Sequence, residues 1–169
     1  MRFEELEPEV HGVILADLIE ECLSSILDQI RALYGLDISP PGGLSMREYA
    51  EGSADELAHP GNFCYLVEEN GEYIGMGAIR EMGRGTGEIK RMYVRPVYRG
   101  RGIGRTLLDR LLEKGAELGY RKVCLDTGRF MEAARNLYRS AGFVERGEYP
   151  GTEVPPEIRD FWLYMERDL

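Results

Sequence analysis

A segment rich in glycine and arginine, between a predicted strand and a predicted helix, constrains this sequence more than any other feature. It reads Val94-Arg95-Pro96-Val97-Tyr98-Arg99-Gly100-Arg101-Gly102-Ile103-Gly104-Arg105. Glycines at alternate positions let the backbone turn tightly, so that successive amide groups converge on one point. The helix that follows adds its own unpaired N-terminal amides and the positive end of its dipole. The pattern is typical of a phosphate-binding loop, and a pyrophosphate is the expected occupant.

Spacing separates this loop from two common phosphate-binding motifs. A P-loop has four residues between its glycines and then Lys and Ser or Thr, whereas Gly100 and Gly104 are separated by three residues and followed by Arg105-Thr106. The dinucleotide fingerprint GxGxxG also fails, and the segment follows a predicted hairpin rather than the first strand of a Rossmann unit. The alternative is a glycine-rich turn without a ligand. Arg99, Arg101 and Arg105 argue against it, because guanidinium groups pair well with phosphates.

Hydrophobic periodicity predicts one mixed domain of helices and strands spanning residues 1–169. Apolar positions at helical spacing predict helices over 13–34, 45–57, 105–118 and 131–141. Segments rich in β-forming residues predict strands over 63–67, 73–80, 88–94, 122–126 and 161–166, with a further strand beginning at 143–144. Asn70-Gly71 is a hairpin turn signal between the first two of these strands, and Pro96 ends the third. Strands and helices in this order predict an α/β or α+β fold.

The net charge of −9 conceals a strong segregation of charge along the chain. The balance is −13 over residues 1–79, +8 over 80–146 and −4 over 147–169. The basic middle segment contains the glycine loop, which suggests a localised anionic ligand, although a solvated basic surface would look the same. The acidic total disfavours binding to nucleic acid, which depends on contacts to phosphates.

Cysteine usage and the absence of apolar runs predict a cytoplasmic location. The sequence has three widely spaced cysteines, Cys22, Cys64 and Cys124, and no CxxC pair. Such cysteine usage is typical of a protein in a reducing compartment. The acidic N-terminal residues 1–10 lack a signal-peptide pattern, and no apolar run approaches the roughly 20 residues that cross a bilayer. His11 and His59 have no metal-ligand spacing, so no metal is expected.

The loop and the segments around it together resemble the GNAT N-acetyltransferase superfamily. Arg99-x-x-Gly102-x-Gly104 is similar to the family's acyl-CoA pyrophosphate loop, and 88–94 looks like its fourth strand. Residues 134–143, with Leu-Tyr before Gly-Phe, look like its fourth helix. The resemblance covers about residues 63–169, while the helices within 1–60 fit only in kind. It implies a mixed, mostly antiparallel sheet with splayed fourth and fifth strands, flanked by helices.

The resemblance also implies a cofactor site for acetyl-CoA. The backbone of Met92, Tyr93 and Val94 would hold the pantetheine arm, unless the strand there is fully paired. The pyrophosphate would lie against the loop residues Arg99, Gly100, Arg101, Gly102, Ile103, Gly104 and Arg105. The backbone amide near Met92 would stabilise the oxyanion of a tetrahedral intermediate as the amine attacks the thioester directly. Where the family often has a CoA-contacting asparagine, this sequence has Met131.

Two side chains correspond to catalytic groups of the family. Tyr138 matches the tyrosine that protonates the departing thiolate, and it would also contact the cofactor; the alternative is a core tyrosine, since Ala134, Leu137 and Ala141 flank it at helical spacing. Glu88 matches a glutamate that serves some members as the base, which would need a pKa above the usual value of about 4.3. The alternative is a solvent-facing glutamate paired with Lys90.

The expected function is transfer of the acetyl group from acetyl-CoA to a primary amine of a small molecule. The acidic residues of segment 148–161, together with Asp126 and the acidic N-terminal helix, would suit a cationic amine, although acidic loops also serve solubility alone. Acetylation of protein lysines or N-termini and a non-catalytic acyl-CoA-binding module are the alternatives. Neither a nucleic-acid nor a membrane partner is expected, and the chain is expected to be a monomer or a homodimer.

Overall fold

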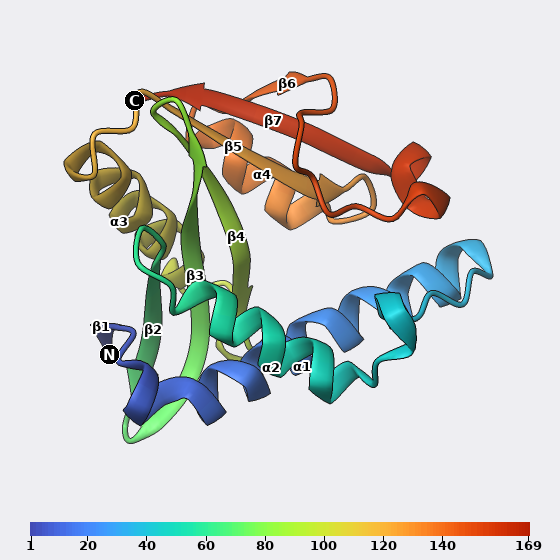
Figure 1. The fold of residues 1–169 in the computed structure, drawn as a ribbon, viewed down its shortest axis with the longest axis horizontal. Helices are drawn as coiled ribbons and strands as arrows, with labels where there is room; N and C mark the ends of the chain where they lie inside the picture. Colours follow the sequence, from blue (N-terminus) through green and yellow to red (C-terminus); the bar gives the residue numbers. More distant parts are fainter.

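Seven strands of the computed structural model, which describes residues 1–169, form one sheet in the order β1-β2-β3-β4-β5-β7-β6 (Figure 1). Their bounds are Arg2–Glu5 (β1), Phe63–Glu69 (β2), Glu72–Gly83 (β3), Thr86–Val94 (β4), Lys122–Gly128 (β5), Val144–Arg146 (β6) and Trp162–Asp168 (β7). Neighbouring strands are antiparallel except β4 and β5, which are parallel. The predicted mixed, mostly antiparallel sheet is therefore confirmed.

Four α-helices flank the sheet, and three short 3₁₀ turns lie in the loops. The helices are Pro8–Tyr34 (α1), Met46–Leu57 (α2), Ile103–Glu117 (α3) and Glu132–Ser140 (α4), and the 3₁₀ turns are Pro41–Gly43 (η1), Pro96–Tyr98 (η2) and Pro156–Phe161 (η3). α3 connects the two parallel strands, as a parallel pair requires. None of the helices combines the length and the apolar character needed to cross a bilayer.

Local sequence signals explain where several elements begin and end. The predicted hairpin joins β2 and β3 through Asn70 and Gly71, whose φ angles of 55° and 83° fit the left-handed conformation that this turn demands. Gly35, at φ 68°, ends α1, and its amide donates to the carbonyl of Arg31. Ser45 caps α2 by accepting from the amide of Glu48, whose carboxylate in turn accepts from the Ser45 amide.

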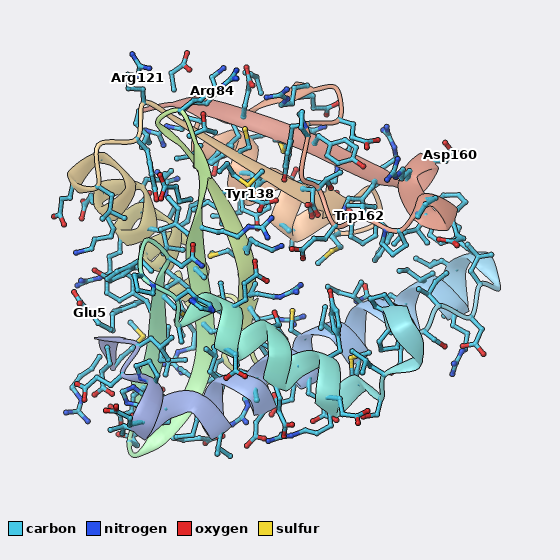
Figure 2. All side chains as sticks on the ribbon, in the orientation of Figure 1. Glu5, Arg84, Arg121, Tyr138, Asp160 and Trp162 are labelled. Carbon is cyan, nitrogen blue, oxygen red and sulfur yellow. The ribbon has the colours of Figure 1, made fainter.

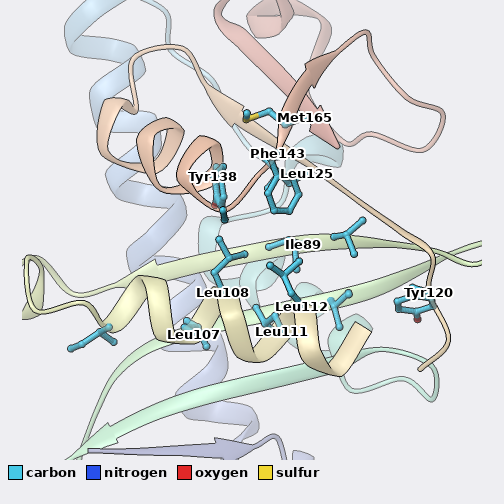
Figure 3. Close-up of a cluster of buried hydrophobic side chains, with 14 of the residues drawn as sticks. Ile89, Leu107, Leu108, Leu111, Leu112, Tyr120, Leu125, Tyr138, Phe143 and Met165 are labelled. Atoms are coloured by element: carbon cyan, nitrogen blue, oxygen red, sulfur yellow. The ribbon is translucent and has the colours of Figure 1, made fainter. Parts of the chain in front are cut away.

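One face of the sheet is covered by α3 and α4. Leu107, Leu108 and Leu111 of α3 are fully buried, and they pack with strand residues such as Ile79 and Val123. Figure 3 shows this cluster, with Tyr138 of α4 at its edge beside Phe143. The predicted apolar stripe of α3 therefore lies against the sheet.

The opposite face has two separate apolar clusters. α1 and α2 cover β2 and β3 through residues such as Leu15, Leu18 and Leu66, all fully buried. Beyond β4, the C-terminal half of α1 approaches the loops around β7 instead, where Ile30 belongs to a cluster with Trp162. α1 therefore spans both halves of the sheet, and a space is left where the halves diverge.

The structure differs from the sequence-based expectation mainly at the edges. The strand β1 was not predicted; it pairs with β2 at the edge of the sheet. α1 begins at Pro8 rather than near residue 13, because proline fits the first turn of a helix. β4 begins at Thr86 rather than at residue 88, so that Gly87 lies inside the strand. A Cβ atom there would approach the ring of Tyr120 to 2.7 Å, so this glycine permits close packing.

Candidate active site

The glycine loop ends in an uncapped helix N-terminus. Gly100 and Gly102 have φ angles of 76° and 78°, and no side chain caps α3. The first helical bond of α3 runs from the Thr106 amide to the Gly102 carbonyl at 3.1 Å, so the amides of residues 103–105 precede it. Nothing lies within 4 Å of the position that a Cβ atom would take at either glycine. Three free donors and an open approach suit an anionic group.

The three arginines of the loop have carboxylate or carbonyl partners. Arg101 makes two bonds of 2.8 Å to Glu69, and Arg105 contacts both carboxylate oxygens of Asp109 at 2.9 Å. Arg99 donates to the Val94 carbonyl at 2.8 Å. Their side chains are close to the loop and charged, but a phosphate would have to compete with these partners for Arg101 and Arg105.

β4 and β5 are paired only at one end, which leaves the rest of β4 open. Residues 86–88 pair with residues 122–124, and beyond this seam the two strands separate. Residues 89–94 of β4 therefore have no backbone partner on the β5 side. The part of β4 that includes Met92, Tyr93 and Val94 therefore lacks a neighbouring strand on this side, although the Val94 carbonyl accepts from Arg99 at 2.8 Å.

A β-bulge interrupts β4 just before these residues. The register with β3 shifts between Met76 and Ala78, and Arg91 has a φ angle of 56°. Gly77 lies opposite the bulge, and a Cβ atom there would approach the sulfur of Met92 to 2.7 Å. Met92 lines the cleft described next, whereas the Tyr93 side chain is buried on the α1 side.

A cleft of about 650 Å³ lies at the divergence of the two strands. Its walls come from α1, the segment 37–41, the open part of β4, the end of β5 and the segment 152–158. Met131, at the start of α4, also lines it. So do Tyr138 and Trp162, which are labelled in Figure 2. Of the predicted cofactor and catalytic residues, Met92, Met131 and Tyr138 therefore meet in one cleft.

Tyr138 is buried in the core and also faces the cleft. Its ring packs edge-to-face on Phe143 at 5.9 Å, which is what the core alternative predicts. However, Tyr138 also lines the cleft, and its hydroxyl makes no hydrogen bond to the protein. Burial raises the pKa of this hydroxyl, so that the proton stays on the oxygen at neutral pH. A protonated hydroxyl on the cleft wall is what a proton donor requires.

Glu88 lies behind the cleft wall rather than on it. Its side chain is completely buried, and one carboxylate oxygen accepts from Arg80 at 2.6 and 3.0 Å. The other oxygen accepts from the Tyr149 hydroxyl at 2.7 Å, and the Lys90 ammonium lies 3.9 Å away. Neither expectation describes this environment fully: Glu88 is near Lys90, but it is not solvent-facing, and it does not line the cleft.

A chain of polar side chains joins Glu88 to the cleft. The Tyr149 hydroxyl, which donates to Glu88, is also 3.3 Å from Asp126 Oδ2. Trp162 Nε1 donates to Asp126 Oδ1 at 2.7 Å. Asp126 lines the cleft, and burial raises the pKa of its carboxyl group. Sequence reasoning had noted the acidity of Asp126 but missed Tyr149 and Trp162, because only the fold places these distant residues beside it.

The acidic segment after β6 is partly neutralised by basic residues of β3 and β4. Glu153 contacts Lys90 at 2.5 Å and Arg80 at 2.6 Å, and Arg91 lies 3.8 Å from it. One of the acidic residues expected to attract a cationic amine is thus already paired. No cluster of three or more His, Cys, Asp or Glu side chains is arranged to hold a metal ion.

The sequence and the fold both match known acetyltransferases. The model of the acetyltransferase (GNAT) family matches residues 27–143. An IAA acetyltransferase of Azospirillum brasilense is 36% identical over 114 residues, which are 67% of this chain and 72% of that protein. Among solved structures, an acetyltransferase of Streptococcus agalactiae is similar with a TM-score of 0.73, at 20% identity over 99% of this chain and 98% of that chain. The Salmonella typhimurium protein yncA, solved with its cofactor acetyl-CoA, has a TM-score of 0.68 at 19% identity, covering 100% of this chain and 94% of that chain. At these identities, the two structures show a shared fold.

Proposed function

The chain belongs to the GNAT acetyltransferase family, and on this premise we propose that it transfers the acetyl group of acetyl-CoA directly to a primary amine of a small molecule. The observation that carries the proposal is the cleft at the fork of β4 and β5, which brings an unpaired strand and the Tyr138 hydroxyl to one wall. The free amides at the start of α3, which follows the end of this strand, support an anion site in the same chain.

The residues present fit acetyl-CoA. The amides of residues 100–105 would hold the pyrophosphate, with Arg99 close by. The open backbone of residues 92–94 would hold the pantetheine arm as an added strand, since its amide groups resemble a peptide. Met131, on the cleft wall, offers the arm an apolar contact in place of the amide that an asparagine would give. When bound, acetyl-CoA supplies an activated thioester.

The chain's own groups would then act on the transfer itself. A backbone amide near Met92, beside the bulge, would stabilise negative charge on the carbonyl oxygen as the amine attacks. Tyr138 would donate its proton to the departing sulfur. Glu88 stays a predicted base that could act only through Tyr149 and Asp126, because it does not reach the cleft. Cys22, Cys64 and Cys124 are buried, which suits direct transfer without a covalent enzyme intermediate.

Thiol release from acetyl-CoA across a panel of small amines tests the proposal. We expect release with at least one amine and a loss of about 10²- to 10⁴-fold in kcat for Tyr138→Phe, with folding intact. Tyr120→Phe is the matched control, since its hydroxyl bonds to the Gly61 carbonyl at 3.2 Å, away from the cleft. Unchanged turnover of Tyr138→Phe would remove this residue from the mechanism.

The same assay separates the alternative functions. Acetylation of intact proteins without acetylation of small amines would support a protein acceptor. Binding of acetyl-CoA without thiol release from any acceptor would support a non-catalytic module.

A further inference from the structure

The carboxylates on the cleft wall differ in their partners. Asp37 contacts Arg31, and Glu153 contacts Lys90 and other basic groups. Glu157 forms no salt bridge, but it is exposed to solvent. Asp126, by contrast, is largely buried and forms no salt bridge, and the groups nearest its two oxygens, Trp162 Nε1 and the Tyr149 hydroxyl, are neutral. A carboxylate that is largely removed from water without a cationic partner is costly to keep charged. Asp126, at the fork of the strands, therefore has no bonded cation that would stabilise its ionised carboxylate.

The walls that extend from Asp126 are mostly apolar. α1 contributes Leu23, Ile26 and Leu27, all partly exposed to the cleft. The facing segment contributes apolar groups that include Val154 and Pro155. A ligand body along these walls gains by burying apolar surface, whereas a second charged group against them would lose its hydration. The one unpaired carboxylate of the lining other than Asp126, that of Glu157, is exposed to solvent.

We propose that the acceptor is a primary amine carried on an apolar aliphatic or aromatic body, and that Asp126 binds its ammonium group and accepts one of its protons. This inference rests on the proposed function and names the substrate class of the same site. It assigns the role of base to a residue of β5 that lines the cleft, rather than to Glu88. Polyamines and lysine side chains of proteins fit the site poorly, because their additional charges or peptide groups would meet apolar walls.

The protons of the step balance. The ammonium group gives one proton to the Asp126 carboxylate, and the free amine attacks the acetyl carbon. As the C–N bond forms and the C–S bond breaks, the sulfur takes a proton from Tyr138, and the nitrogen loses its second proton. That second proton replaces the proton that Tyr138 donated, so Tyr138 is again protonated. The proton on Asp126 passes to water. The net products are the amide, the free thiol and one proton.

Several charged or titratable groups surround Asp126. Glu88 and Lys90 face it from β4, Tyr149 from the loop after β6, and Tyr138 from α4. Burial is the main cause of the raised pKa of Asp126, and the negative charge of Glu88 adds to it. Since the ionised form of Asp126 accepts the proton, kcat/KM should rise as the pH rises through this pKa.

A series of amines tests the apolar body. We expect kcat/KM to rise from propylamine to hexylamine by about fourfold for each buried methylene group. We expect 1,6-diaminohexane, which differs from hexylamine only by a second ammonium group, to react at least about tenfold more slowly. Faster reaction of the diamine, of spermidine or of a lysine peptide would overturn the inference while leaving the proposed function standing. Absence of thiol release with every amine would overturn both.

A substitution on the apolar cleft wall also tests whether the acceptor amine carries an apolar body. Leu27→Asn should raise KM for hexylamine several-fold and leave KM for ethylamine unchanged, with kcat affected little. Leu33→Asn is the matched control, because Leu33 lies on the same helix, is 59% exposed and does not line the cleft. Equal effects of Leu27→Asn on both amines would contradict an apolar body in this part of the cleft.

Asp126→Asn tests the polar end of the subsite. We expect kcat/KM for hexylamine to fall by about 10²- to 10⁴-fold and the rise of kcat/KM with pH to disappear. Asp160→Asn is the control, since Asp160 is exposed and lies near the outer end of η3 (Figure 2). Retention of the rise with pH in Asp126→Asn would overturn its role as proton acceptor.

Binding of the amine can be measured without turnover. The chain has a single tryptophan, and Trp162 both lines the cleft and donates to Asp126. We expect hexylamine to change the fluorescence of the wild-type protein with saturation, and the dissociation constant to rise at least about tenfold in Asp126→Asn. Equal dissociation constants for the two proteins would show that Asp126 does not hold the ammonium group, and would overturn the inference.

Discussion

The substitutions Gly102→Ala and Gly52→Ala make the same chemical change at two positions that differ in backbone conformation. We expect them to have opposite effects on the free energy of unfolding. Gly102 stands at the start of α3 with a φ angle of 78°. Gly52 is exposed in the interior of α2, and its φ is not positive. Nothing lies within 4 Å of the new Cβ atom at either position, so steric contact with neighbours does not distinguish them.

The backbone angles set the size of the two effects. A left-handed conformation costs an alanine about 1 to 2 kcal/mol, so Gly102→Ala should lower the free energy of unfolding by about 1 kcal/mol or more. Gly52→Ala should raise it by up to about 1 kcal/mol, because alanine loses less backbone entropy than glycine in a helix. The two variants should therefore differ by about 2 kcal/mol, or about 4 to 8 °C in Tm for a chain of this length.

Urea unfolding followed by circular dichroism measures the difference, and acetyl-CoA titration adds a second readout. Gly102→Ala should also weaken acetyl-CoA binding, because a shift in this residue turns the free amides of α3 away from the anion; Gly52→Ala should leave the affinity unchanged. Gly102→Ala with the stability of the wild type or above it would refute the reasoning, since it would mean that the positive φ is not required there.

Three further predictions concern the buried acid, the loop arginine and the thiols. Glu88→Gln should lower the free energy of unfolding by about 2 kcal/mol or more, because it leaves a buried guanidinium short of a partner. It should also move the rise of kcat/KM to lower pH without abolishing it, because it removes the negative charge that helps to raise the pKa of Asp126; complete loss of the rise would assign the base to Glu88. Glu69→Gln should tighten acetyl-CoA binding several-fold by releasing Arg101, as calorimetry would show, and unchanged affinity would place Arg101 outside the phosphate site. Burial raises the pKa of Cys22 to about 11 and that of Cys64 to about 12, so both thiols should react slowly with a disulfide reagent at pH 8 in the native protein and rapidly in urea; fast native labelling would contradict their burial.

Most of the fold could be predicted because the local signals agreed with the global arrangement. Asn70-Gly71 specified one hairpin, and the leucines of α3 specified which face is buried. β1 could not be predicted, since four residues at a sheet edge carry too short a pattern and draw their stability from pairing with β2. The candidate cofactor residues were the part of the site that was easiest to single out from the sequence, because the loop and the strand before it are contiguous.

The acceptor side of the cleft could not be predicted in the same way. Asp126 becomes distinctive only when the fold places Trp162, 36 residues away, and Tyr149 against it. The environment of Glu88 depends likewise on Arg80, which the β3–β4 register places directly opposite it. These contacts join residues that are far apart in the sequence and belong to no recognisable motif. No spacing pattern in the sequence therefore predicts them.

The short seam between β4 and β5 has a mechanical consequence. β1–β4 form one continuous antiparallel ladder and β5, β7 and β6 form another, and three register pairs join the two. Local opening at the seam breaks few bonds, whereas opening within either ladder breaks many. Amide hydrogen exchange should therefore report two blocks of protection that meet at residues 86–88, with each ladder opening as a unit of its own.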